Sequence, residues 1–140
     1  MKPIPLTEEA LVLRTDFTNQ AAWERIAAAV QKPVGFFRFR ANLNFLDDPA
    51  YSGITKEQLL ELIPKDYNHS FIMVVDAFTI ARADHPLLIL DLYGEVGNEF
   101  RAIPSQIQGI ENNLSIANMD FEDFSGSVDK DGVFRGFPRG

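Results

Sequence analysis

The 140-residue chain contains no cysteine. This absence excludes disulfides, thiol nucleophiles, zinc ribbons and iron–sulfur clusters. Histidine occurs only twice, as His69 and His85. Each precedes an expected strand, and neither has a second histidine or a glutamate at metal-binding spacing. We therefore expect no metal site of this type and no cofactor.

Long apolar runs are also missing. The longest, Phe71 to Val75, is far shorter than the roughly 20 residues of a membrane-spanning helix. The N-terminus has neither the apolar stretch nor the small-residue cleavage site of a secretory signal. We expect a cytoplasmic protein that makes no membrane contact.

Basic residues are outnumbered. The net charge is −7, with −1 in residues 1–70 and −6 in residues 71–140. Nucleic-acid affinity comes mainly from basic contacts to phosphates, and the chain has no basic stripe, so we expect no nucleic-acid binding. The acidity either serves solubility or forms a face for a basic partner.

The chain contains enough hydrophobic residues to form a buried core. Hydrophobic residues make up 46% of the chain, and twelve of them are phenylalanines. A chain of this size buries about two thirds of its surface on folding. The length fits one globular domain over residues 1–140, with a core of about 10–137.

Hydrophobic periodicity predicts alternating strands and helices. Apolar or alternating runs predict strands at 11–15, 36–45, 71–75, 87–93 and 99–103. Helical spacing and cap residues predict helices between 16 and 35, at 55–63, 77–83, 105–119 and 120–128. The clearest start signal is Thr55 with Gln58, which have the form of a capping box. Phe134 and Phe137 are candidates to anchor the C-terminal tail.

The order of these elements predicts an α/β fold, with α+β as the alternative. Alternation in the first half favours parallel strands joined by crossover helices, and the turn at 94–97 favours an antiparallel hairpin. We expect a mixed sheet of about five strands with helices packed on its faces.

Three predicted strands run directly into aspartates: Asp16, Asp76 and Asp91. If all three strands are parallel, the carboxylates lie at one edge of the sheet, where open α/β sheets bind ligands. Such an acidic cluster suits a hard cation such as Mg²⁺. The alternative is that Asp16 and Asp76 cap the helices that follow them, and that Asp91 points outward from its strand. No phosphate-binding glycine loop accompanies these residues.

The segment from Glu111 to Asp131 is the most unusual part of the chain. It contains six acids and one lysine, and several asparagines lie within an expected helix. The asparagines either turn and cap the backbone or contribute to a contact surface. The residues of this candidate interaction surface are Glu111, Asn112, Asn113, Asn118, Asp120, Glu122, Asp123 and Arg135.

Several motifs carry a resemblance to a known family. The most specific are ENNLSIANMDF at 111–121 and DGVFRGF at 131–137. Others are LVLRTD at 11–16, DPAYSG at 48–53 and the pair His85-Pro86 before LDL at 90–92. Together they resemble a family of small bacterial single-domain proteins of unknown function. The resemblance implies one bacterial domain and brings no activity or catalytic residue.

Two hypotheses for function follow. The first is a non-enzymatic protein-binding domain, comparable to an immunity protein that neutralises a basic partner, on the basis of the acidic segment. The second is a small enzyme or ligand-binding domain that uses Asp16, Asp76 and Asp91, with Arg14 or Arg135 holding an anion. The first is preferred. A homodimer is compatible with either, because two-fold pairs are common.

Overall fold

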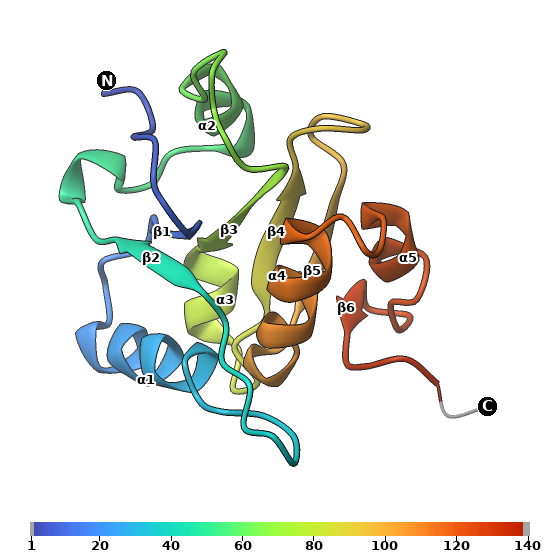
Figure 1. Cartoon of the computed structure of the whole chain (residues 1–140). Coiled ribbons are helices and arrows are strands. Elements are labelled where there is room, and N and C mark those ends of the chain that lie inside the picture. Colours follow the sequence, from blue (N-terminus) through green and yellow to red (C-terminus); the bar gives the residue numbers. More distant parts are fainter. Residues whose placement is uncertain (1, 139–140) are drawn as a thin grey trace.

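The computed structural model describes residues 2–138. Its centre is a six-stranded mixed sheet in the order β2-β1-β3-β4-β5-β6 (Figure 1). The strands are β1 (Ala10–Arg14), β2 (Leu43–Leu46), β3 (Phe71–Val75), β4 (Leu87–Asp91), β5 (Glu99–Ala102) and β6 (Val133–Phe134). The α/β class and the mixed sheet are confirmed, with one strand more than expected, because β6 pairs with β5 beyond the turn at Gly132.

Strand direction changes in the middle of the sheet. β2 and β3 both pair with β1 in parallel, as the alternation of strands and helices predicted. β4 runs antiparallel to β3, with Phe71 opposite Asp91, and β5 runs antiparallel to β4. The carboxyl end of β4 therefore lies at the edge of the sheet where β1 and β3 begin.

The helices are α1 (Gln20–Val30), α2 (Lys56–Glu61), α3 (Ala77–Ala81), α4 (Ile107–Ser115) and α5 (Phe121–Ser125), with 3₁₀ turns at Pro49–Tyr51 and Pro104–Gln106. The capping box of Thr55 and Gln58 is present at the start of α2. Asn19, rather than a residue at 16–18, caps α1. The expected helix at 105–119 is shorter and consists of a 3₁₀ turn followed by α4.

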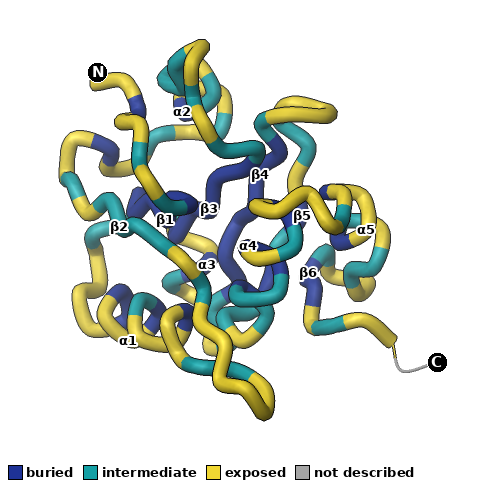
Figure 2. Tube along the Cα trace, viewed as in Figure 1, coloured by how far each residue is buried: buried dark blue, intermediate teal, exposed yellow. Residues whose placement is uncertain are grey.

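Both faces of the sheet are covered, which explains why β1, β3 and β4 are apolar at nearly every position. Val12, Met73 and Ile89 belong to the core layer that also contains α1, α4 and α5 side chains. Their neighbours along each strand, such as Leu13 and Val74, belong to the layer that contains Leu59 of α2. Figure 2 shows the buried strands between exposed outer segments.

The sequence interpretation was wrong for residues 36–42. Only Leu43–Leu46 joins the sheet, and Phe36, Phe37 and Phe39 are 92%, 76% and 58% exposed. Alternating hydrophobicity predicted a half-buried strand here, but no sheet neighbour covers these side chains. Among the described residues, no helix has the length and apolar character needed to cross a membrane.

Candidate functional site: an acid-lined cleft at the amino edge of the sheet

The three aspartates of the expected acidic cluster do not meet. Asp16 and Asp76 follow the parallel strands β1 and β3 and lie toward the same edge of the sheet. Asp91 ends β4 and pairs with Phe71 at the start of β3, so it lies at the opposite edge. The expectation of one shared site assumed a parallel β4. Among residues 2–138, no group of three acidic or histidine side chains is arranged to hold a metal ion.

Asp16 and Asp76 both have local structural partners. Asp16 Oδ1 accepts hydrogen bonds from the backbone N–H and the hydroxyl of Thr18. Asp76 caps α3 by accepting from the N–H of Thr79, and it also pairs with Arg101 through contacts of 2.7 and 3.0 Å. Burial acts to raise the pKa of Asp76, but the hydrogen bonds from Arg101 and Thr79 outweigh it and hold the pKa below its usual range.

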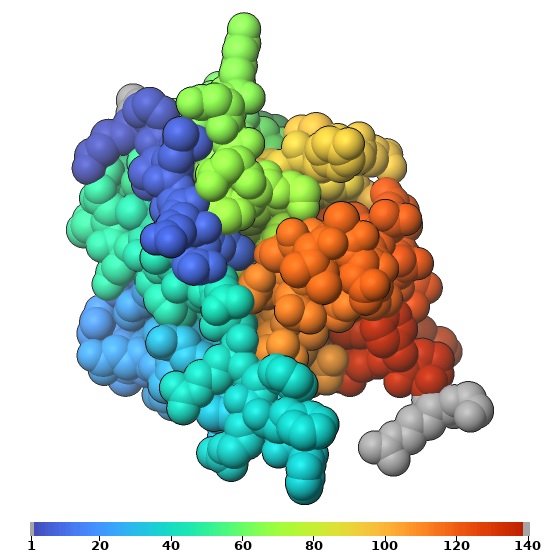
Figure 3. Space-filling view, viewed as in Figure 1, coloured from blue at the N-terminus to red at the C-terminus, as the bar shows by residue number. Residues whose placement is uncertain are grey.

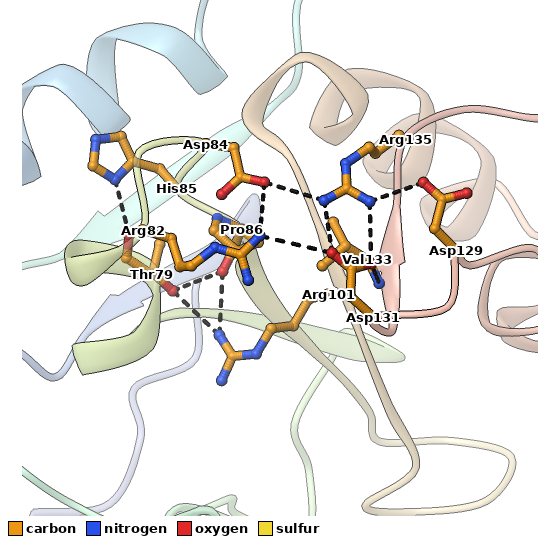
Figure 4. Close-up of polar contacts among 10 residues, drawn as sticks. All are labelled: Thr79, Arg82, Asp84, His85, Pro86, Arg101, Asp129, Asp131, Val133 and Arg135. Atoms are coloured by element: carbon orange, nitrogen blue, oxygen red, sulfur yellow. Dashed lines mark hydrogen bonds and ion pairs between the residues drawn. The ribbon is translucent and has the colours of Figure 1, made fainter.

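An ion-pair network occupies the same edge of the sheet (Figure 4). Arg135 donates to Asp129 at 2.8 Å, to Asp131 at 2.8 Å and to Asp84 at 3.2 Å, and Arg82 pairs with Asp84 and Asp131. The hydrogen bond from Arg135 lowers the pKa of Asp131 to about 2. Arg135 is thus paired with three carboxylates of its own chain. Its positive charge is therefore not free to bind an anion.

Arg14, the other candidate anion clamp, is buried. Its guanidinium donates to the Asp16 carbonyl and to Gln20, and it pairs with Asp47 at 3.2 Å. It also lies over the ring of Phe17, 4.4 Å from the ring centroid. These contacts fix the junction between β1 and α1.

A concave feature lies at the other edge, where β1 and β3 begin and β4 ends. It is a cleft of about 770 Å³ between the segment before β1, the start of β3, the turn after β4 and the α4–α5 connection. Figure 3 shows the blue N-terminal segment, the green segment before β3 and the orange α4 bordering one another on the visible face. We call it the acid-lined cleft. Its acidic members are Glu8, Glu9, Asp91, Glu111, Asp120 and Glu122.

Two of these acids are buried and build the walls. Asp91 accepts hydrogen bonds from the N–H groups of Tyr93, Gly94 and Glu95, which shapes the turn after β4. Glu111 accepts from the N–H of Asn42 at 2.6 Å and from the hydroxyl of Ser115 at 2.7 Å, which ties α4 to the segment before β2. Both carboxylates are only 2–3% exposed. All four carboxylate oxygens therefore have hydrogen-bond partners within the chain.

The other acids stand at the rim. Among the described residues, no ion pair involves Glu8, Glu9 or Glu122, and Glu122 lies beside Gly94 in the turn after β4. A Cβ atom on Gly94 would lie 3.3 Å from Asp91 Oδ2 and 3.9 Å from Glu122 Oε1. The glycine therefore keeps this part of the cleft open between a buried and an exposed carboxylate.

The floor of the cleft is apolar, with Phe71, Leu114 and Phe121 among its lining residues. The described residues that line the cleft include no lysine and no arginine, and one histidine, His69, whose Nε2 contacts the Thr7 carbonyl at 2.8 Å. An apolar floor beneath unpaired carboxylates suits a ligand with an aliphatic or aromatic body and a cationic head.

The cleft brings together half of the interaction surface expected from the sequence. Glu111, Asn112, Asp120 and Glu122 line it. The rest lie outside: Asn113 bonds to the Gly109 carbonyl and to Asn118, Asp123 accepts from the Asp120 N–H, and Arg135 lies at the far edge. Asn113 thus binds the backbone of its own helix, as the capping alternative expects, whereas the Asn118 side chain donates to the Asn113 side chain.

Sequence reasoning missed the contribution of Glu8, Glu9, Asn68, His69 and Tyr93. Glu8 and Glu9 lie near Asn68 and His69 because β1 and β3 are parallel. Tyr93 joins them because β4 is antiparallel to β3. The rule that ligands bind beyond the carboxyl ends of strands directed attention to the opposite edge. The eleven residues between β3 and β4 allow either direction, so no local signal was available.

Comparison with known proteins places the chain in a family. No curated protein matches it. A family model described as a domain of unknown function matches residues 9–137. The match covers nearly the whole chain and includes both motifs, 111–121 and 131–137, that carried the resemblance. The chain therefore belongs to the DUF6924 family, whose function is unknown.

Proposed function

We propose that this chain is a protein-binding domain whose acid-lined cleft receives cationic side chains of a basic partner protein. One observation carries the proposal: a cleft of about 770 Å³ is lined by six carboxylates and, among its described residues, by no lysine or arginine. A cavity with charge of one sign favours a ligand of the opposite sign.

The geometry favours side chains over small ions. The two buried carboxylates already have partners, so an ion would meet only the separated carboxylates at the rim. A lysine or arginine can place its aliphatic stem on the apolar part of the lining while its head reaches Glu8 or Glu122. The arrangement is thus suited to a basic segment that lies across the cleft.

The charge of the whole chain supports association with a basic protein. A net charge of −7 on 140 residues steers a cationic partner toward the molecule and speeds encounter more than it fixes affinity. A small acidic bacterial protein of the cytoplasm with such a cleft could neutralise a basic protein in the way an immunity protein does. This remains the preferred hypothesis, and homodimerisation is compatible with it.

No specific observation on the described residues supports the enzyme alternative. It required Asp16, Asp76 and Asp91 to converge, and β4 carries Asp91 to the other edge. The carboxylate of Asp76 is occupied by Arg101 and Thr79. We therefore propose no reaction.

The test uses two matched triple variants and the basic proteins encoded by neighbouring genes. The first neutralises the rim of the cleft: Glu8→Gln, Glu9→Gln and Glu122→Gln. The second makes the same charge change on α1 and α2, where the residues are exposed and do not line the cleft: Glu24→Gln, Glu57→Gln and Glu61→Gln.

Partner affinity is measured by calorimetry at low and high salt. At about 1 kcal/mol for each half-exposed charge pair, the rim variant loses on the order of 100-fold in affinity. The control variant changes mainly the association rate, because its charges act only at long range. Equal losses for the two variants, or no complex with any basic neighbour, would contradict the proposal.

A further inference from the structure

A small hairpin between α1 and β2 carries three phenylalanine rings outside the body of the protein. Val34 and Phe39 close it with reciprocal backbone hydrogen bonds of 2.8 and 2.9 Å. The turn is completed by positive φ angles of 74° at Gly35 and 57° at Arg38. The segment is exposed throughout its tip (Figure 2) and projects, in cyan, from the lower end of the molecule (Figure 3). We call residues 34–40 the aromatic hairpin.

The rings contact one another more than they contact the core. Phe36 and Phe37 meet edge to face with their centroids 5.2 Å apart, and Phe37 and Phe39 lie 6.0 Å apart. With exposures of 92%, 76% and 58%, they present on the order of 450 Å² of apolar surface, at about 200 Å² per side chain. A patch of this size on a monomer commonly marks a binding surface.

Unpaired cations flank the rings. Among residues 2–138, no ion pair involves Lys32, Arg38 or Arg40, whereas Arg14, Arg82, Arg101 and Arg135 are all paired. Residues 25–46 contain four cations and no acid, which is a charge of +4. The rest of the chain carries −11, so the net charge is −7. The molecule therefore has a basic, aromatic tip on an acidic body.

The size and shape of this surface decide between occupants. A stable protein interface needs about 800 Å² on each partner, roughly twice what the rings offer. A lipid surface has no such minimum, because a few inserted rings and adjacent cations contribute independently to binding. The tip also projects from the body of the molecule on the visible face (Figure 3).

We propose that the aromatic hairpin docks on a membrane surface rich in anionic lipids. Phe36, Phe37 and Phe39 enter the boundary between headgroups and acyl chains, and the guanidinium groups of Arg38 and Arg40 bind lipid phosphates. Repulsion of the acidic body is limited because charges beyond about 8–10 Å are screened at physiological salt. The earlier expectation of no membrane contact came from the absence of a spanning segment, which surface binding does not require.

The test is co-sedimentation of the full chain with vesicles of phosphatidylcholine and phosphatidylglycerol, and with vesicles of phosphatidylcholine alone. We expect binding to the anionic vesicles that weakens as salt is raised. The affinity of the variant Phe36→Ser/Phe37→Ser for anionic vesicles should fall at least about tenfold for each ring removed. The affinity of the variant Arg38→Gln/Arg40→Gln for the same vesicles should fall about 30-fold, or about fivefold for each arginine. Val96→Ser, which removes a 62% exposed apolar side chain from another loop, is the matched control and should bind as the natural chain does.

A second measurement reports insertion directly. In Phe37→Trp, the new tryptophan should shift its emission to the blue when anionic vesicles are added, while Trp23, which is only 5% exposed, stays unchanged. The proposal is overturned if the natural chain fails to bind anionic vesicles at low salt, or if the serine variant binds them equally well. It is also overturned if vesicles leave the emission unchanged and the hairpin instead drives self-association that the serine variant abolishes.

Discussion

Replacing Asp76 with asparagine tests whether this aspartate is a structural group. Its carboxylate receives two hydrogen bonds from Arg101, at 2.7 and 3.0 Å, and one from the N–H of Thr79 at 3.1 Å. The side chains of Asp76 and Arg101 are 25% and 18% exposed. The pair is therefore shielded from water but not fully buried. Asparagine keeps the shape and removes the charge.

The expected loss follows from these contacts. Breaking a fully buried pair costs about 3–5 kcal/mol, and an exposed pair contributes under about 1 kcal/mol. For this half-buried pair we expect Asp76→Asn to lower the free energy of unfolding by about 2–3 kcal/mol. In a chain of this length, that corresponds to a fall in Tm of about 8 °C. Asp129→Asn, at a 59% exposed partner of Arg135, is the control and should change stability little.

The loss should also depend on pH. The folded pKa of Asp76 lies below its value in the unfolded chain, so its contribution is present above an unfolded pKa of about 4. The contribution disappears as the pH falls through the lower, folded pKa. Denaturant unfolding should therefore separate natural chain and variant fully at neutral pH and bring them together in strong acid. Equal stability at neutral pH, or a gap that persists in strong acid, would refute this reasoning.

Three further outcomes are expected. Thr55→Ala should lower the free energy of unfolding by about 1 kcal/mol in urea titrations, because it removes the side-chain cap of α2. Glu111→Gln should lower it by about 1–3 kcal/mol and increase hydrogen exchange at the Asn42 amide, because a buried carboxylate that accepts from Asn42 and Ser115 is lost. Burial raises the pKa of Tyr67 to about 12. The contribution of Tyr67 to stability should therefore be complete below about pH 10 and be lost as the pH rises toward 12. Tyr67→Phe should remove this alkaline dependence in ultraviolet-monitored unfolding.

The parts of the fold that depend on local chemistry were predictable. The apolar strands Phe71–Val75 and Leu87–Leu90 are continuous because both faces of the sheet are covered. The capping box of Thr55 and the cap provided by Asp76 depend on residues only three positions apart. Such signals are contained within one turn of chain, so the sequence alone was sufficient.

The parts of the fold that depend on residues far away in the sequence could not be predicted. Alternation at Phe37, Phe39 and Ala41 predicts a strand equally well whether or not a neighbouring strand is there to pair with it. The direction of β4 depends on how residues 76–86 pack, and it determines which edge of the sheet receives Asp91. The acid-lined cleft combines these two effects, since Asn42 and Asp91 both contribute to it. The part contributed by Glu111, Asn112, Asp120 and Glu122 could be anticipated, because these residues share one unusually acidic segment.

The central claim is that the cleft binds a cationic group, and chemical-shift mapping tests it without a known partner. The probe is a capped Arg-Phe-Arg tripeptide titrated into the isotope-labelled full chain. Gly94→Leu places a side chain between Asp91 and Glu122 without changing the net charge, and Val96→Leu adds the same side chain at an exposed position of the same turn. We expect shifts that gather on amides of the acid-lined cleft in the natural chain and in Val96→Leu, and that vanish in Gly94→Leu. Shifts spread over the whole acidic surface, or unchanged in Gly94→Leu, would contradict the account.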